Sequence, residues 1–139
     1  MCLAHGARAS TADVDVVIAD DVRVSVLEAA GRVAASLQLP SNWLSDGARR
    51  FVSRVPEGTI VLNTPTLVVR AAPPEQLLAM KLWAWRDEVD IDDARLLLSK
   101  LPGDMEQVWS LIGGFLEPAG RAQARYNFED LWEATHEPS

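Results

Sequence analysis

Hydrophobic and polar positions in the first half of the chain follow two different periods. Residues 13–18 place β-branched side chains between acids, which is typical of a strand. Residues 21–39 instead repeat apolar side chains at helical spacing. Two short apolar runs, 59–62 and 67–71, flank an Asn-Thr-Pro turn and predict a β-hairpin. The first half therefore predicts strands together with one helix.

The second half of the chain keeps the helical period almost throughout. Pro74 suits the first turn of a helix that runs to about Arg86, and a second helix is expected over residues 90–101. Asp104 can cap a third helix, and a fourth is expected over residues 121–134.

Strands thus cluster in residues 1–72 and helices in residues 73–135. This segregation predicts an α+β fold, with a small mixed sheet in the first half and helices that pack on it and form the second half. The length of 139 residues and the apolar share of 48% suit one domain over residues 1–139.

The composition excludes several classes of protein. No run of 18 apolar residues is present, so the sequence predicts no membrane partner. Residues 1–8 lack the pattern of a signal peptide, and a single cysteine excludes an internal disulfide and a cysteine-based zinc site. We therefore expect a cytoplasmic protein. The net charge of -7 argues against binding nucleic acid by overall charge, although a local basic patch is compatible with it.

Asp13 and Asp15 are the most informative pair of side chains. On a strand, residues i and i+2 point to the same face, which places these carboxylates roughly 7 Å apart. Like charges so placed are stabilised by a cation between them, and Mg²⁺ prefers such oxygen ligands. Two metals can clamp the attacking and leaving oxygens of a phosphoryl displacement. The alternative is that both acids face water from a half-exposed strand.

Lys81 is unusual because it lies within an apolar helical stripe. Its helical neighbours at positions 77, 78, 84 and 85 are Leu, Leu, Ala and Trp. It either covers the core with its stem or places its ammonium against phosphates. Asp90 and Asp93, three residues apart, either bear a function or serve the start of the next helix, with Asp90 as its N-cap.

The residues around the acidic pair resemble the first motif of bacterial nucleotidyltransferases. The match is to the toxin-type branch related to AbiEii, found in toxin–antitoxin and abortive-infection systems. That motif reads Gly-Gly, a helix turn, Arg, Ser or Thr, and Asp-x-Asp, and the residues that match it are Arg8, Ser10, Thr11, Asp13 and Asp15. The Gly-Gly would fall just before Met1, so the chain is expected to begin inside the motif, as an N-terminally truncated copy.

A second stretch is similar to the same family. The family pattern is Lys, Ala, Arg and then Asp-x-x-Asp at the next helix, and the matching residues are Lys81, Ala84, Arg86, Asp90 and Asp93. The resemblance implies that Lys81 and Arg86 neutralise nucleotide phosphates. It also implies that an acid such as Asp90 helps to take the acceptor proton.

The resemblance as a whole implies an enzyme that transfers NMP from an NTP to an acceptor hydroxyl. Asp13 and Asp15 would be catalytic and bind Mg²⁺ or Mn²⁺, and Arg8, Ser10 and Thr11 would contact the nucleotide. An RNA such as tRNA, or a protein, is the expected acceptor. A cognate antitoxin and a second copy of the chain are the expected partners. The alternative is a catalytically impaired module with this fold that acts in the assembly or regulation of a partner.

Overall fold

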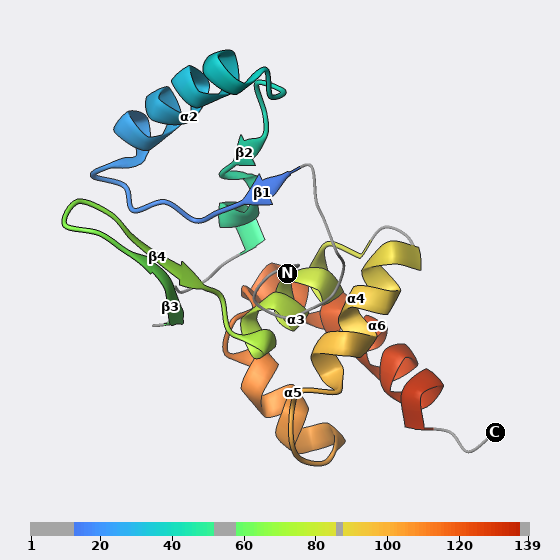
Figure 1. Cartoon of the computed structure of the whole chain (residues 1–139). Coiled ribbons are helices and arrows are strands. Elements are labelled where there is room, and N and C mark those ends of the chain that lie inside the picture. The colour runs from blue at the N-terminus through green and yellow to red at the C-terminus, as the bar shows by residue number, and fades with distance from the viewer. Residues whose placement is uncertain (1–12, 52–57, 86–87, 137–139) are drawn as a thin grey trace.

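A strand-rich part and a helical part make up the chain, and they lie side by side (Figure 1). The computed structural model describes residues 13–51, 58–85 and 88–136. The strand-rich part contains β1 (Val14–Asp15), α2 (Arg23–Leu37), β2 (Leu44–Ser45), the 3₁₀ helix η1 (Gly47–Phe51), β3 (Thr59–Asn63) and β4 (Val68–Ala71). The helical part contains α3 (Pro74–Trp83), α4 (Glu88–Leu98), α5 (Met105–Gly113) and α6 (Pro118–His136). The predicted α+β class is confirmed.

The described strands form two separate two-stranded sheets, which corrects the expectation of one mixed sheet. β1 pairs with β2 in parallel, and β3 pairs with β4 in antiparallel. The strand expected over residues 13–18 shortens to Val14–Asp15. The reason is that the backbone of Ile18 is bound by the side chains of Asp46 and Arg49 instead of by a neighbouring strand.

The helix expected over residues 21–39 is present as α2. It ends at Leu37, after which Gln38 takes the left-handed conformation with a φ of 55°. Its burial differs from the expectation, because Ala34 is its buried residue whereas Val24 is 68% exposed. The helical period correctly predicted the helix, but it did not predict how much of its apolar face is buried.

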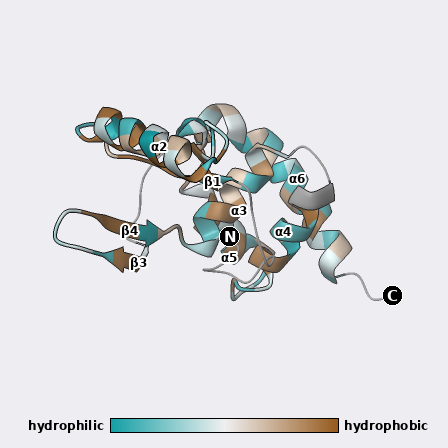
Figure 2. Cartoon of the chain, turned by 45° about the horizontal axis from the view of Figure 1, so that its top comes forward, coloured by the Kyte–Doolittle hydropathy of each residue, from teal (hydrophilic) through white to brown (hydrophobic). Residues whose placement is uncertain are grey.

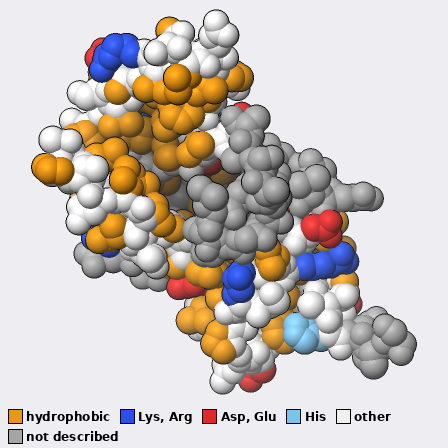
Figure 3. All heavy atoms as spheres, in the orientation of Figure 1, with side chains coloured by type: hydrophobic (Ala, Val, Ile, Leu, Met, Phe, Trp, Pro, Cys, Tyr) orange, Lys and Arg blue, Asp and Glu red, His pale blue; other side chains and the backbone are white. Residues whose placement is uncertain are grey.

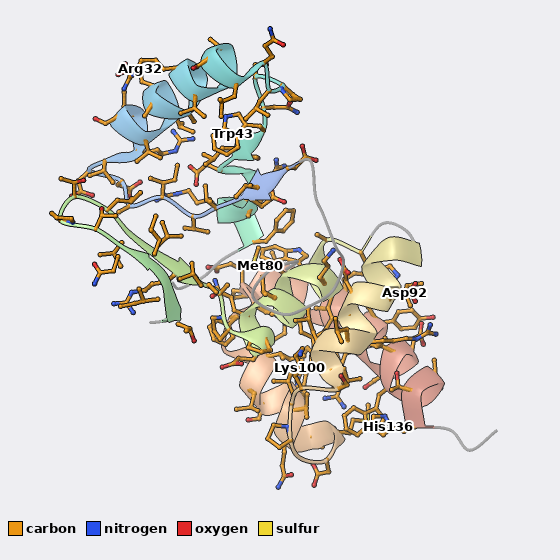
Figure 4. The ribbon with its side chains drawn as sticks, viewed as in Figure 1. Arg32, Trp43, Met80, Asp92, Lys100 and His136 are labelled. Atoms are coloured by element: carbon orange, nitrogen blue, oxygen red, sulfur yellow. The ribbon has the colours of Figure 1, made fainter. Side chains whose placement is uncertain are left out.

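Trp43 joins α2 to the segment that leads into β2. Its indole Nε1 donates a hydrogen bond to the Ala30 carbonyl at 3.0 Å. Figure 4 shows this side chain below α2. The half-buried indole therefore links α2 to the segment before β2.

The expected hairpin is confirmed. Thr59 pairs with Ala71 at its open end and Asn63 with Val68 near the turn, with a bulge at Val61. Gly58 precedes β3, and a Cβ there would lie 1.9 Å from the Ala71 carbonyl oxygen, so only glycine fits.

The hydrophobic core lies in the helical part. Leu78 and Leu82 of α3, Leu97 of α4, Ile112 of α5 and Phe128 of α6 are fully buried and belong to one cluster. The helical stripes predicted for the second half supply these residues, so burial of apolar surface holds α3–α6 together. Among the described helices, none is long and apolar enough to cross a membrane.

Polar contacts fix the ends and the packing of α5. Asp104 is its N-cap as predicted: the Asp104 side chain accepts from the Gln107 N–H, and the Gln107 side chain accepts from the Asp104 N–H, both at 2.9 Å. Arg125 of α6 donates to Glu106 of α5 and to Glu129, each at 2.6 Å. These two carboxylates raise the pKa of Arg125, so the guanidinium stays charged.

An aromatic contact connects the two parts. Phe51, the last residue of η1, meets the Trp83 ring edge-on with a centroid distance of 5.4 Å. Trp83 also packs on Gly120 of α6, where a Cβ would lie only 2.2 Å from the indole. The strand-rich part therefore rests on α3 at a point that is itself fixed by α6.

Candidate functional site

Asp13 and Asp15 lie on either side of the residue that anchors β1. The Val14 N–H donates to the Trp43 carbonyl at 2.7 Å, and the Val16 N–H donates to the Ser45 carbonyl at 2.9 Å. Both aspartates are exposed. Alternation along an extended chain places their carboxylates on the same side, about 7 Å apart. The backbone is therefore fixed by β2 while the two acids face outward.

The donor set of this pair fits a magnesium ion. Carboxylate oxygens are hard ligands, and Mg²⁺ is usually bound through one or two carboxylates while its remaining positions are filled by water and phosphate oxygens. Two exposed aspartates on a fixed strand leave those remaining positions accessible. Among the described residues, no group of three or more His, Cys, Asp or Glu side chains is placed to hold a metal.

A buried carboxylate fastens the segment that follows β1. Asp46, just after β2, accepts a hydrogen bond from the Ile18 N–H at 3.2 Å and a second one from Arg23 Nε. Its side chain is only 3% exposed. Arg49 donates to the Ile18 carbonyl at 2.9 Å and pairs with Asp20 at 2.6 Å. Both polar backbone groups of Ile18 are thus bound by residues at or next to η1, which holds β1 in register.

The charges around Asp46 shift its ionisation. Burial alone would raise the pKa of this carboxyl, but the hydrogen bonds from Arg23 and Ile18 and the charges of Arg23 and Arg49 outweigh it, so the pKa lies below its ordinary value. A group whose pKa is lowered by folding stabilises the folded state above its unfolded pKa. That contribution disappears as the pH falls through its folded pKa.

We expect Asp46→Asn to reduce the free energy of unfolding by about 2 kcal/mol at neutral pH, because two hydrogen bonds to a charged acceptor are weakened. The difference from the wild type should shrink as the pH falls below about 5, through the ordinary carboxyl range and on through the lowered pKa of Asp46. Urea unfolding of both proteins at each pH measures it. A difference that stays constant over this range would contradict the role given to the ionised carboxylate.

Lys81 and Asp93 meet between α3 and α4. Lys81 Nζ lies 3.0 Å from Asp93 Oδ2, and the two side chains are 22% and 7% exposed. The sequence offered two interpretations of this lysine, a stem that covers the core and an ammonium that meets phosphate. The structure places the ammonium beside a buried carboxylate, and 22% of the lysine side chain is exposed.

The structure also changes the interpretation of the Asp-x-x-Asp pattern. The helix α4 begins at Glu88, so Asp90 lies inside its first turn and is not its N-cap. The side chain of Asp90 lies outside the described part of the chain, as do Arg8, Ser10, Thr11 and Arg86. Their predicted contacts with a nucleotide stay predictions.

Sequence analysis did not identify the contacts that Asp46 and Asp93 make near this site. The Asp46 carboxylate binds Ile18 and Arg23 across 28 and 23 residues, which no local pattern indicates. For Asp93 the local pattern favours an acid near the start of the helix. A signal for Asp93 was present, because Leu97, four residues later, lies on the apolar face of the same helix.

No family model, no curated protein and no solved structure matches this chain.

Proposed function

We propose that this chain is a metal-dependent nucleotidyltransferase of the AbiEii-like toxin type, which acts in the cytoplasm and transfers NMP from an NTP to a hydroxyl of an RNA such as tRNA. The observation that carries the proposal is the pair of exposed aspartates, Asp13 and Asp15, beside a valine fixed to β2. The motif that continues upstream to Arg8, and the Lys81 motif far downstream, add support from the sequence.

The reaction requires few groups from the protein. The acceptor oxygen forms a bond to the α-phosphorus of the NTP, the bond to the β-phosphate oxygen breaks, and pyrophosphate leaves. When bound by Asp13 and Asp15, Mg²⁺ would polarise the phosphate oxygens and neutralise their charge. One of these carboxylates, or that of Asp90, receives the proton of the acceptor hydroxyl.

Lys81 contributes positive charge on the phosphate side of the reaction. Its ammonium is held by Asp93, so its position is set before a ligand arrives. Because the side chain is 22% exposed, the ammonium can approach a phosphate without a large rearrangement of α3. Asp93 is then a positioning residue that acts through Lys81.

The test is transfer of a label from each of the four α-labelled NTPs to total RNA, with Mg²⁺ and the full chain. We expect labelled RNA from at least one nucleotide. Asp13→Asn and Asp15→Asn should each lower the rate at least about a hundredfold, because each removes a charged metal ligand.

A matched control is Asp92→Asn. Asp92 is also an exposed aspartate, with a side chain that is 81% exposed, and it pairs with Arg95 on the outer side of α4. Figure 4 shows it away from β1. This variant should keep the wild-type rate. No transfer by the wild type with any nucleotide, or equal transfer by Asp15→Asn, would refute the proposed function.

A further inference from the structure

A pocket of about 280 Å³ lies between α4 and α6 in the helical part of the chain. The two helices are in contact, and they lie side by side in Figure 1. The pocket is lined by residues of both helices and of the segment between α3 and α4, namely Trp85, Ile91, Arg95, Asp130, Leu131 and Ala134. Its volume is just below the range of about 300–1,000 Å³ that is common for ligand pockets, so it suits a small molecule.

Four of the six side chains that line the pocket are apolar. Leu131 is 2% exposed and belongs to the hydrophobic core, whereas Trp85 and Ile91 are half-buried. Figure 2 shows both hydrophilic and hydrophobic residues along α4, as expected for a helix with one face on the core. An apolar group that enters the pocket would therefore leave water for a surface of one indole and several aliphatic side chains.

The other two side chains carry opposite charges and come from different helices. Arg95 belongs to α4 and Asp130 to α6, and both residues are exposed. Figure 3 shows acidic and basic side chains close together on the surface over these helices. These two described residues form no ion pair with each other, and the guanidinium of Arg95 instead approaches Asp92 at 3.5 Å. The pocket is therefore bordered by one cation and one anion that do not neutralise each other directly.

Both charged groups can still bind a ligand. A guanidinium has five N–H donors, and the Arg95 group uses one of them for a long hydrogen bond to Asp92. Within the ranges that the structure describes, Asp130 takes part in no hydrogen bond or ion pair, so its carboxylate oxygens can accept from a ligand.

The two charges select the chemistry of the ligand. A ligand with a single charge would satisfy one of the two groups and would bring that charge close to the like charge of the other. A ligand with an ammonium and a carboxylate satisfies both groups. When these two groups are attached to the same carbon, a third substituent remains that can enter the apolar part of the pocket. This is the arrangement of a free α-amino acid.

We infer that the pocket between α4 and α6 binds a free α-amino acid with a large apolar side chain. Its carboxylate contacts Arg95, its ammonium contacts Asp130, and its side chain packs against Trp85 and Leu131. The pocket contains none of the residues proposed for catalysis, so this inference does not depend on the proposed enzymatic activity.

Titration of L-phenylalanine into the isotopically labelled full chain, followed by amide chemical shifts, tests the inference. We expect shifts in α4 and α6 around the pocket and a Kd below about 1 mM, because the ligand is small and both charges are exposed to solvent. Phenethylamine lacks the carboxylate, and hydrocinnamate lacks the ammonium. Each analogue should bind at least about tenfold more weakly than L-phenylalanine, because each loses one charge-assisted contact.

Variants assign each charge of the ligand to one residue. Arg95→Gln should weaken L-phenylalanine at least about tenfold without weakening phenethylamine, and Asp130→Asn should do so without weakening hydrocinnamate. Ala134→Phe should prevent binding because it fills the pocket and leaves both charges in place. Glu133→Gln is the matched control, since Glu133 is an exposed acid of α6 that does not line the pocket. It should bind like the wild type.

The amide spectrum of each variant verifies that it is folded. The absence of shifts with L-phenylalanine up to its solubility limit would overturn the inference. Equal affinity for L-phenylalanine and phenethylamine would also overturn it, because binding would then depend on the apolar surface and the ammonium alone. The same holds if folded Arg95→Gln and Asp130→Asn proteins both bind L-phenylalanine as the wild type does.

Discussion

Gly120→Ala is expected to lower the free energy of unfolding by about 3 kcal/mol and the Tm by roughly 10 °C. The Cβ of an alanine at this position would lie 2.2 Å from Cε2 and 2.4 Å from Nε1 of the Trp83 indole. A rigid ring in a packed interface has little room to move, and Trp83 is also in contact with Phe51. The substitution should therefore disturb both the α3–α6 packing and the junction to the strand-rich part.

Gly31→Ala is the matched control for this prediction. Gly31 also lies in a helix, α2, but nothing lies within 4 Å of the Cβ that alanine would add. Alanine is the better helix former by up to about 1 kcal/mol, so this variant should be slightly more stable than the wild type. The same substitution thus has opposite signs at the two positions, and urea unfolding measures both.

A double variant identifies the cause of the expected loss. If the indole is the obstacle, Gly120→Ala combined with Trp83→Leu should be less destabilised than the sum of the two single variants. Additive effects, or a Gly120→Ala protein as stable as Gly31→Ala, would show that the α3–α6 contact is not limited by the indole.

The elements that the sequence predicted well are those set by local rules. The four helices of the second half, the hairpin around its Asn-Thr-Pro turn and the Asp104 cap all follow from short-range periodicity or turn chemistry. The strand predicted over Asp13–Ile18 is longer than the observed one. Alternation indicates which side chains can face the same way, but a strand also needs a neighbouring strand with which to pair. Beyond Val16 the backbone is bound by side chains instead.

Burial was less predictable than secondary structure. Val24 has the apolar character of a core residue and a helical position, yet it is 68% exposed, because no described element packs over it in the way that α6 packs over α3. The candidate site shows the same limit. The exposed pair Asp13 and Asp15 could be predicted because the two acids lie two residues apart on a predicted strand. The hydrogen bond of Asp46 to Ile18, in contrast, depends on tertiary packing that no local pattern predicts.

The ion pair of Lys81 with Asp93 is expected to stabilise the fold. This effect on stability can be measured separately from the catalytic role that is proposed for Lys81. Asp93→Ala removes a buried carboxylate 3.0 Å from the Lys81 ammonium. Breaking a buried ion pair costs about 3–5 kcal/mol, and because 22% of the Lys81 side chain is exposed we expect a loss of about 2–3 kcal/mol. Chemical unfolding measures this loss.

Replacing both partners separates the two roles of the pair. Lys81→Met with Asp93→Leu exchanges the ion pair for apolar side chains of similar size, so stability should return to within about 1 kcal/mol of the wild type. The proposed function predicts that this stable double variant loses nucleotidyl transfer at least about a hundredfold, because the charge that meets the phosphates is gone. A stable double variant that keeps wild-type transfer would show that Lys81 serves packing alone.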